Sequence, residues 1–147
     1  MAQSQLPEVI LSRVINPDGA GKERMRQTKG IVLAIRELAQ QDGPGIESRD
    51  LAAFIALALG IISETIDVTV TPWEKRDYWV KADKFRMDWA WSGQYGEKMR
   101  RAVLNEDWGS VAQIAALTAQ KLSKVTVPLG NRLGRPWAGA WTELRNQ

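Results

Sequence analysis

The chain contains neither histidine nor cysteine, and these two absences exclude whole classes of chemistry. Histidine is the usual general acid and base at neutral pH and the commonest metal ligand, while cysteine is the other routine nucleophile and soft-metal ligand. Ser-His-Asp and Cys-His catalysis, zinc sites with nitrogen or sulfur ligands, haem held by His or Cys, and disulfide bonds are all excluded. Enzymatic activity through Asp, Glu, Lys, Arg, Tyr or Ser stays open, but the sequence favours a non-enzymatic protein without a cofactor or metal.

The chain also has no long apolar run and little net charge. The longest apolar run, Leu51 to Ile62, has twelve residues and is interrupted only by Gly60, whereas a membrane-spanning helix needs about twenty. The polar start, Met1 to Gln5, does not resemble a secretory signal. We therefore expect a cytoplasmic protein that does not bind membranes. The net charge of +3, from 20 basic and 17 acidic residues, is too small to predict a nucleic-acid partner by itself.

What the sequence does contain is the composition of one globular domain over residues 1–147. Hydrophobic residues make up 44% and charged residues 25%, which is ordinary for a folded protein. The seven tryptophans are unusual for this length. They predict either a large aromatic core or aromatic side chains exposed for binding.

Apolar residues recur at three- and four-residue steps in four segments, which predicts four main helices at about 21–41, 48–66, 72–104 and 107–124. The helix over 48–66 is apolar nearly all round, so it must be surrounded, either by its own bundle or across a subunit interface. Leu6 to Ile15 forms a short apolar segment that is either helix or strand. Residues 125–147 lack a period and predict an irregular arm, held by Trp137 and Trp141.

The helix boundaries are predicted from local capping signals. Ser48 is expected to cap the second helix. Thr71, Pro72 and Glu74 have the spacing of a helix start, with threonine as N-cap, proline at the first position and glutamate at the third. Gly93 and Gly96 weaken the following helix and predict a bend or a division there.

Short connections between these helices make sequential neighbours antiparallel. The predicted fold is an all-α, antiparallel four-helix-type bundle with a short N-terminal segment and an irregular C-terminal arm.

Two sequence patterns resemble parts of active sites, but neither predicts a complete site. Gly19 to Lys22 lacks the first glycine and the final Ser or Thr of a phosphate-binding loop. The acidic pairs Glu47/Asp50 and Glu64/Asp67 flank one predicted helix and would lie about 25 Å apart along it. They cannot share one magnesium ion within a subunit, although Glu64 and Asp67 could join Asp83 or Asp88 in a second arrangement.

Aromatic and basic residues alternate between Trp73 and Arg101. Most aromatic positions fall on the core-facing seam of the predicted helix, while Val80, Met87 and Trp91 form a second apolar strip beside it. Trp73, Trp79 and Trp91 are the candidate residues for binding a partner or ligand, since exposed large aromatics mark grooves and protein interfaces.

The densest basic cluster comprises Lys22, Arg24, Arg26 and Lys29, with only Glu23 opposing it. These four residues are the candidates for contacting nucleic-acid phosphates. Pairing with acidic residues of a neighbouring helix is an equally good explanation of the cluster.

Three functions follow from these observations. The first is a non-enzymatic interaction or assembly module, expected to form a homo-oligomer through the apolar helix or the Trp-rich helix, with any other protein partner unknown. The second is a nucleic-acid-associated basic helical protein. The third is a small-ligand binder, with a cavity walled by Trp89, Trp91 and Met87, or a magnesium–carboxylate enzyme.

Overall fold

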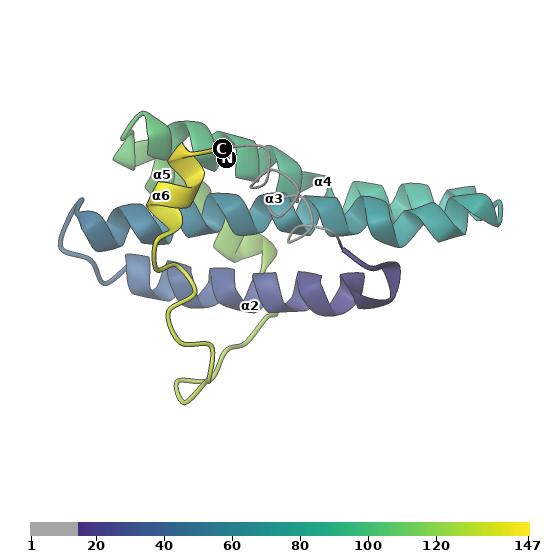
Figure 1. Ribbon diagram of the computed structural model, residues 1–147, viewed down its shortest axis with the longest axis horizontal. Coiled ribbons are helices and arrows are strands. Elements are labelled where there is room, and N and C mark those ends of the chain that lie inside the picture. The colour runs from purple at the N-terminus through teal and green to yellow at the C-terminus, as the bar shows by residue number, and fades with distance from the viewer. Residues whose placement is uncertain (1–14) are drawn as a thin grey trace, which may run out of the picture.

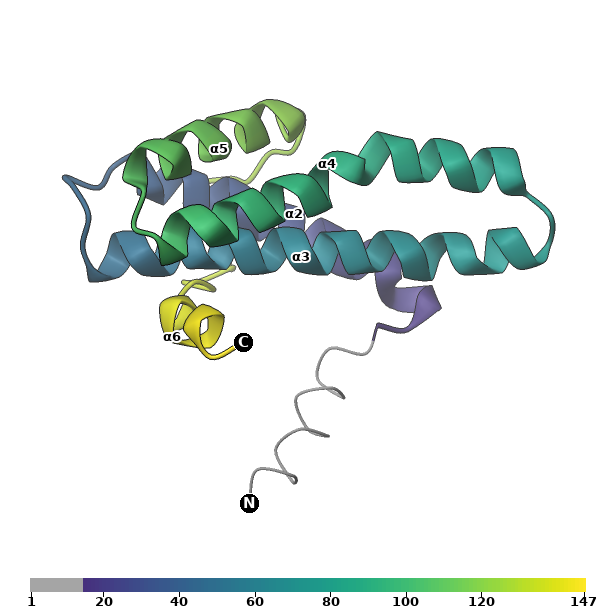
Figure 2. The ribbon, with the colours of Figure 1, turned by 90° about the horizontal axis from the view of Figure 1, so that it is seen from above.

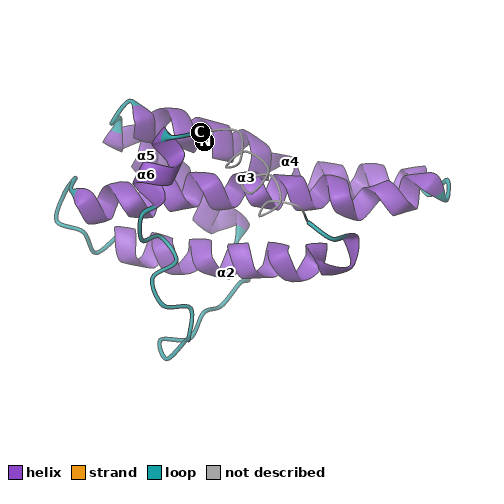
Figure 3. Cartoon of the chain, in the orientation of Figure 1, coloured by secondary structure: helices purple, strands orange, loops and turns teal. Residues whose placement is uncertain are grey.

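The protein is an all-α helical bundle, as the sequence predicts. A computed structural model describes residues 15–147, and this part of the chain contains helices and loops but no strands (Figure 3). The predicted segment Leu6 to Ile15 lies almost entirely outside the described residues. The elements are η1 (Pro17–Gly19), α2 (Ala20–Leu38), α3 (Ile46–Lys75), α4 (Trp79–Leu104), α5 (Trp108–Lys121) and α6 (Ala140–Arg145).

Helix α3 is the core helix of the bundle. Figures 1 and 2 show α2, α4 and α6 arranged around it, and Leu51, Ile55, Leu59 and Ile62 are fully buried. Over the described residues, α3 is the one helix long and apolar enough to cross a membrane, but more than half of its apolar window is buried within the fold. The core helix of a soluble protein has these same properties, and the chain itself covers this helix.

Helices α3 and α4 form a long hairpin that extends beyond the rest of the bundle (Figures 1 and 2). Near the body the two helices approach closely, because small residues face each other there. A Cβ atom on Gly96 would lie 3.1 Å from Leu59 Cβ and 3.4 Å from the Gly60 nitrogen, and one on Gly93 would lie 2.9 Å from Ser63 Oγ. Of the predicted bend or division of α4 at Gly93 and Gly96, the division does not occur, since α4 is one helix, but the helix changes direction about midway (Figure 2). Instead, the glycines allow the helices to approach.

The helix boundary predicted near residues 66–72 is wrong. Helix α3 continues through Pro72 to Lys75, so Thr71 is not a cap. Its hydroxyl donates a hydrogen bond to the Asp67 carbonyl one turn earlier (2.7 Å). The β-branched stretch before Thr71 stays helical because tertiary packing outweighs its weak propensity: Val70 is fully buried.

The true ends of α3 and α4 are two turns of the same kind, each with an acidic residue in the left-handed conformation. Asp77 has φ 63° and Glu106 has φ 51°. After α3, the Tyr78 N–H donates to the Trp73 carbonyl (2.9 Å) and the Asp77 N–H donates to the Glu74 carbonyl (3.1 Å). This is the Schellman pattern, in which the left-handed position is usually glycine. Without glycine, the sequence carries no clear signal for the turn after α3, whereas the break between 104 and 107 is predicted by the end of the apolar periodicity.

The other predicted caps gave mixed results. Ser48 does not cap α3, which begins at Ile46, and its hydroxyl donates to the Gly43 carbonyl instead (2.8 Å). The start of the fourth predicted helix at about residue 107 is confirmed, because α5 begins at Trp108 and its N-cap Asp107 accepts from the Ser110 N–H (3.2 Å).

Helix α2 packs against α3 through small residues. Gly30 and Ala34 are buried, whereas Met25 is half exposed. A Cβ atom on Gly30 would lie 2.9 Å from the Phe54 ring. The smallest residues of α2, rather than its largest apolar ones, therefore set its closest contact with α3.

The C-terminal arm wraps round α2 and ends in α6, which lies on α3 (Figure 1). Arg36 of α2 donates to the Val127 carbonyl (2.6 Å), and Trp137 is 4% exposed. The sequence predicts that the tryptophans hold the arm, and Trp137 is indeed buried and Trp141 half-buried. The short helix α6 was not predicted.

Candidate interaction surface on the helical hairpin

A series of aromatic rings packs along the hairpin, from Phe85 and Trp89 on its inner side onward to Trp91 and Tyr95. Trp73 and Phe85 meet edge to face with centroids 5.4 Å apart, Trp89 and Trp91 stack at 5.7 Å, and Tyr95 lies 5.7 Å from Trp91. Of the predicted cavity walls, Trp89 and Trp91 therefore pack on each other, and Met87 lies on the outside of α4, 74% exposed. These three residues do not enclose a cavity.

Arg24 fastens α2 to this aromatic series. Its guanidinium lies 4.9 Å from the centre of the Phe85 ring and 5.5 Å from that of Trp89. It also donates to the Thr65 and Thr69 hydroxyls (3.3 and 3.2 Å). Within residues 15–147 it forms no ion pair with a carboxylate, and burial lowers the pKa of Arg24. Two ring faces and two hydroxyls thus compensate for the partial burial of this cation.

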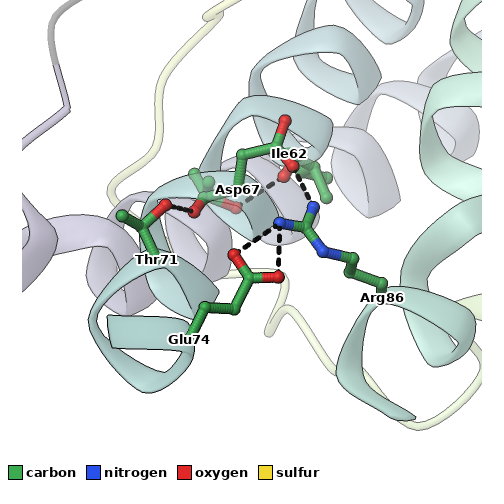
Figure 4. Close-up of polar contacts among 6 residues, drawn as sticks. Ile62, Asp67, Thr71, Glu74 and Arg86 are labelled. Atoms are coloured by element: carbon green, nitrogen blue, oxygen red, sulfur yellow. Dashed lines mark hydrogen bonds and ion pairs between the residues drawn. The ribbon is translucent and has the colours of Figure 1, made fainter. Parts of the chain in front are cut away.

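Arg86 ties α4 to α3 on another side of the hairpin (Figure 4). It donates to the Asp67 carboxylate and, at 3.2 Å, to Glu74. The hydrogen bond with Asp67, aided by Glu74, raises the pKa of Arg86 against the opposing effect of burial. Glu74, which the capping pattern assigned to a helix start, is therefore one half of a link between two helices.

The outer side of the hairpin carries apolar side chains that face solvent. Val80 is 83% exposed and Met87 is 74% exposed on α4, and at the turn Tyr78 and Trp79 are 52% and 53% exposed. Because positions 80, 84, 87 and 91 follow four- and three-residue steps, they share one helix face. We call Val80, Lys84, Met87 and Trp91 the α4 stripe. Trp91 is the half-buried end of this stripe nearest the body, and its ring is already engaged within the chain, stacked on Trp89 and beside Tyr95.

Only one of the three candidate tryptophans is mainly exposed. Trp79 faces solvent at the hairpin turn, whereas Trp73 is half-buried under Lys81, whose Nζ lies 4.2 Å from its ring centre. Val80 and Met87 were not among the candidate residues for binding a partner, and Met87 was named only as a wall of a cavity, although their spacing with Trp91 indicates a second apolar strip. Such spacing alone does not tell whether a strip is covered.

The four candidate nucleic-acid residues do not form one surface. Lys22, Arg26 and Lys29 are exposed on one face of α2, but Arg24 points into the hairpin. Arg26 is paired with Glu23 at 2.6 Å. The basic face therefore has two lysines and one neutralised arginine, which is a weak field for phosphate binding.

The acidic pairs are engaged in the fold. Glu47 pairs with Arg135 (2.6 Å), and Asp50 accepts from the Gly139 and Trp141 N–H groups (3.3 and 2.9 Å), so this pair anchors the C-terminal arm. Asp67 binds Arg86. Across residues 15–147, no three acidic side chains lie close enough together to hold a metal ion.

An apolar groove of about 400 Å³ lies between the end of α2, the following loop and α5. Its walls include Ile35, Leu38, Trp108 and Val111, and Gln41 is among its few polar residues. Nothing in its lining selects one ligand over another. The α4 stripe is more selective than this groove in what it could bind, since charged and apolar groups alternate along it.

Comparison with protein-family models, with curated proteins and with solved structures finds no match for this chain.

Proposed function

We propose that this protein is an interaction module that works by association, and that the α4 stripe together with the exposed hairpin turn is its contact surface. The observation that carries the proposal is the exposure of Tyr78, Trp79, Val80 and Met87 within ten residues of one another. Burial of such residues favours binding by about 25 cal/mol per Å² of apolar area. Large aromatics and methionine are enriched at protein interfaces.

The apolar core helix no longer supports association, because the chain covers it. The support comes instead from the hairpin of α3 and α4, which extends beyond the rest of the bundle (Figure 2) and carries exposed apolar side chains. Homo-association is the simplest form of the proposal, since it needs no second protein. A cytoplasmic location belongs to the same proposal, supported by the absence of cysteine.

The test is the mass of the protein in solution, measured by sedimentation equilibrium from about 1 μM to about 1 mM, the range expected for a small interface. We expect Val80→Asp and Met87→Asp to shift the protein to monomer at concentrations where the unchanged chain is dimeric. Ile46→Asp is the matched control, because Ile46 is also 83% exposed near a helix start but lies far from the stripe. A chain that is monomeric throughout, or one equally affected by all three substitutions, would refute the proposal.

A further inference from the structure

The arrangement of charges on α4 specifies how a second copy would dock, if the stripe is the contact surface as proposed above. Lys84 and Asp88 lie along one edge of the stripe, with Asp83 on the opposite edge. Lys84 Nζ and Asp88 Oδ2 are 3.3 Å apart within one chain, with 74% and 54% of these side chains exposed. Exposed pairs of this kind contribute little to stability, so both groups are available to a partner.

We propose that two copies pair antiparallel through their α4 stripes, about a twofold axis that passes near residue 86. In a twofold interface, residue i contacts j and residue j contacts i. An antiparallel pair brings the same edge of each stripe together in reversed order, so Lys84 faces Asp88 of the partner subunit, and Asp88 faces Lys84 of the partner subunit. In the same register, Val80 lies opposite Trp91 of the partner subunit.

The shape of the molecule favours this direction over a parallel pair. The hairpin arm extends past the body (Figures 1 and 2), so an antiparallel pair places the two bodies at opposite ends and only the arms meet. A parallel pair would bring together the two α5 helices, since α5 packs on the second half of α4 (Figure 2). From Val80 to Trp91 the stripe is about 17 Å long, which is short for a standard interface of about 800 Å² per partner. The dimer is therefore expected to be weak.

Engineered cysteines test the direction, because the chain has none of its own. In the proposed register, residue 87 and its symmetry mate are about 3 Å apart along the axis, and residue 80 and its mate are about 18 Å apart. We expect Met87→Cys to form a disulfide-linked dimer on mild oxidation and Val80→Cys not to. Cross-linking of both variants would indicate a parallel pair and overturn the proposal, as would cross-linking of neither.

Charge reversal tests the register independently. Lys84→Glu and Asp88→Lys should each weaken dimerisation about tenfold or more, because each creates two like-charge contacts. The double variant K84E/D88K should recover the dimer. Asp83→Lys is the control, since Asp83 faces no cation in the antiparallel pair but would face Lys84 in a parallel one. A dimer disrupted by Val80→Asp but insensitive to reversal at 84 and 88 would leave the contact surface standing and refute this register. A chain that is always monomeric would refute both.

Discussion

Replacing Gly96 with alanine tests the close approach of α3 and α4. The new Cβ atom would lie 3.1 Å from Leu59 Cβ, 3.4 Å from the Gly60 nitrogen and 3.5 Å from the Leu59 carbonyl carbon. Two of these atoms belong to the backbone of α3, so they can move only if the helices separate. Alanine raises helix propensity by about 1 kcal/mol over glycine, while overpacking a tight contact costs about 1–3 kcal/mol. We expect Gly96→Ala to leave stability unchanged or to lower it by up to about 2 kcal/mol.

The matched control is Gly60→Ala on the facing helix. No atom lies within 4 Å of a Cβ built on Gly60, so this variant receives the propensity gain without the packing cost. It should be about 1 kcal/mol more stable than the unchanged chain, or about 2–4 °C higher in Tm for a protein of this size. Gly93→Ala should fall between the two, because the atom it would meet at 2.9 Å is the rotatable Ser63 hydroxyl.

Urea unfolding followed by circular dichroism gives these differences, at a protein concentration low enough to exclude association. We expect the free energy of unfolding of the Gly60→Ala variant to exceed that of the Gly96→Ala variant by about 1–3 kcal/mol. Equal stabilisation by both alanines would show that the helices do not meet closely at Gly96, and the explanation given for the glycines of α4 would be wrong.

Four further predictions concern single contacts and use the same unfolding assay. Arg24→Met should destabilise the fold by about 1–3 kcal/mol, because it removes two cation–π contacts and leaves two hydroxyls without their donor. Unchanged stability would contradict the conclusion that Arg24 holds α2 against the hairpin. Trp137→Ala should cost about 3–5 kcal/mol, as expected for a buried aromatic, and a small effect would mean that the arm is loosely held. Asp77→Gly should stabilise by about 0.5–1 kcal/mol, since glycine adopts the left-handed conformation without strain, and destabilisation would contradict the turn geometry. Hydrogen bonds from Ser110 lower the pKa of Asp107. The Asp107 carboxylate should therefore stabilise the fold above the pKa that it has in the unfolded chain, about 4. This stabilisation should be lost as the pH falls through the lower pKa of the folded state. The difference between the unchanged chain and Asp107→Ala should therefore shrink between pH 7 and pH 2, and a constant difference would contradict it.

The fold class could be predicted from the sequence because the apolar periodicity of long helices is a strong signal. The end of α3 could not. Thr71, Pro72 and Glu74 are residues typical of a helix start, yet all three lie in the last turns of α3. Thr71 donates a hydrogen bond within the helix, Pro72 is tolerated because it lies near the helix end, and Glu74 accepts a hydrogen bond from Arg86. The real end depends on Asp77 in a conformation that usually signals itself through glycine.

The direction in which a side chain points is the second feature that could not be predicted from the sequence. Arg24 and Arg26 are two residues apart and looked equivalent in the basic cluster, but a two-residue step turns a helix by more than half a circle. One therefore lies against Phe85 and Trp89, while the other is exposed. Only the position of α2 against the hairpin decides which of the two is available to a partner.

The two sides of the hairpin likewise differ in whether their side chains are engaged within the fold. On the inner side, Arg24, Arg86 and the aromatic rings fix α4 to its neighbours through contacts that a partner would have to break. On the outer side, the apolar side chains at positions 80 and 87 lie beside charges that make only a weak contact within the chain. An interface gains most from groups that are exposed and not already engaged, and on α4 these conditions coincide at Val80 and Met87. A substitution on the inner side should therefore change stability first, whereas one on the stripe should change association without loss of fold, and this separation is the sharpest consequence of the proposed function.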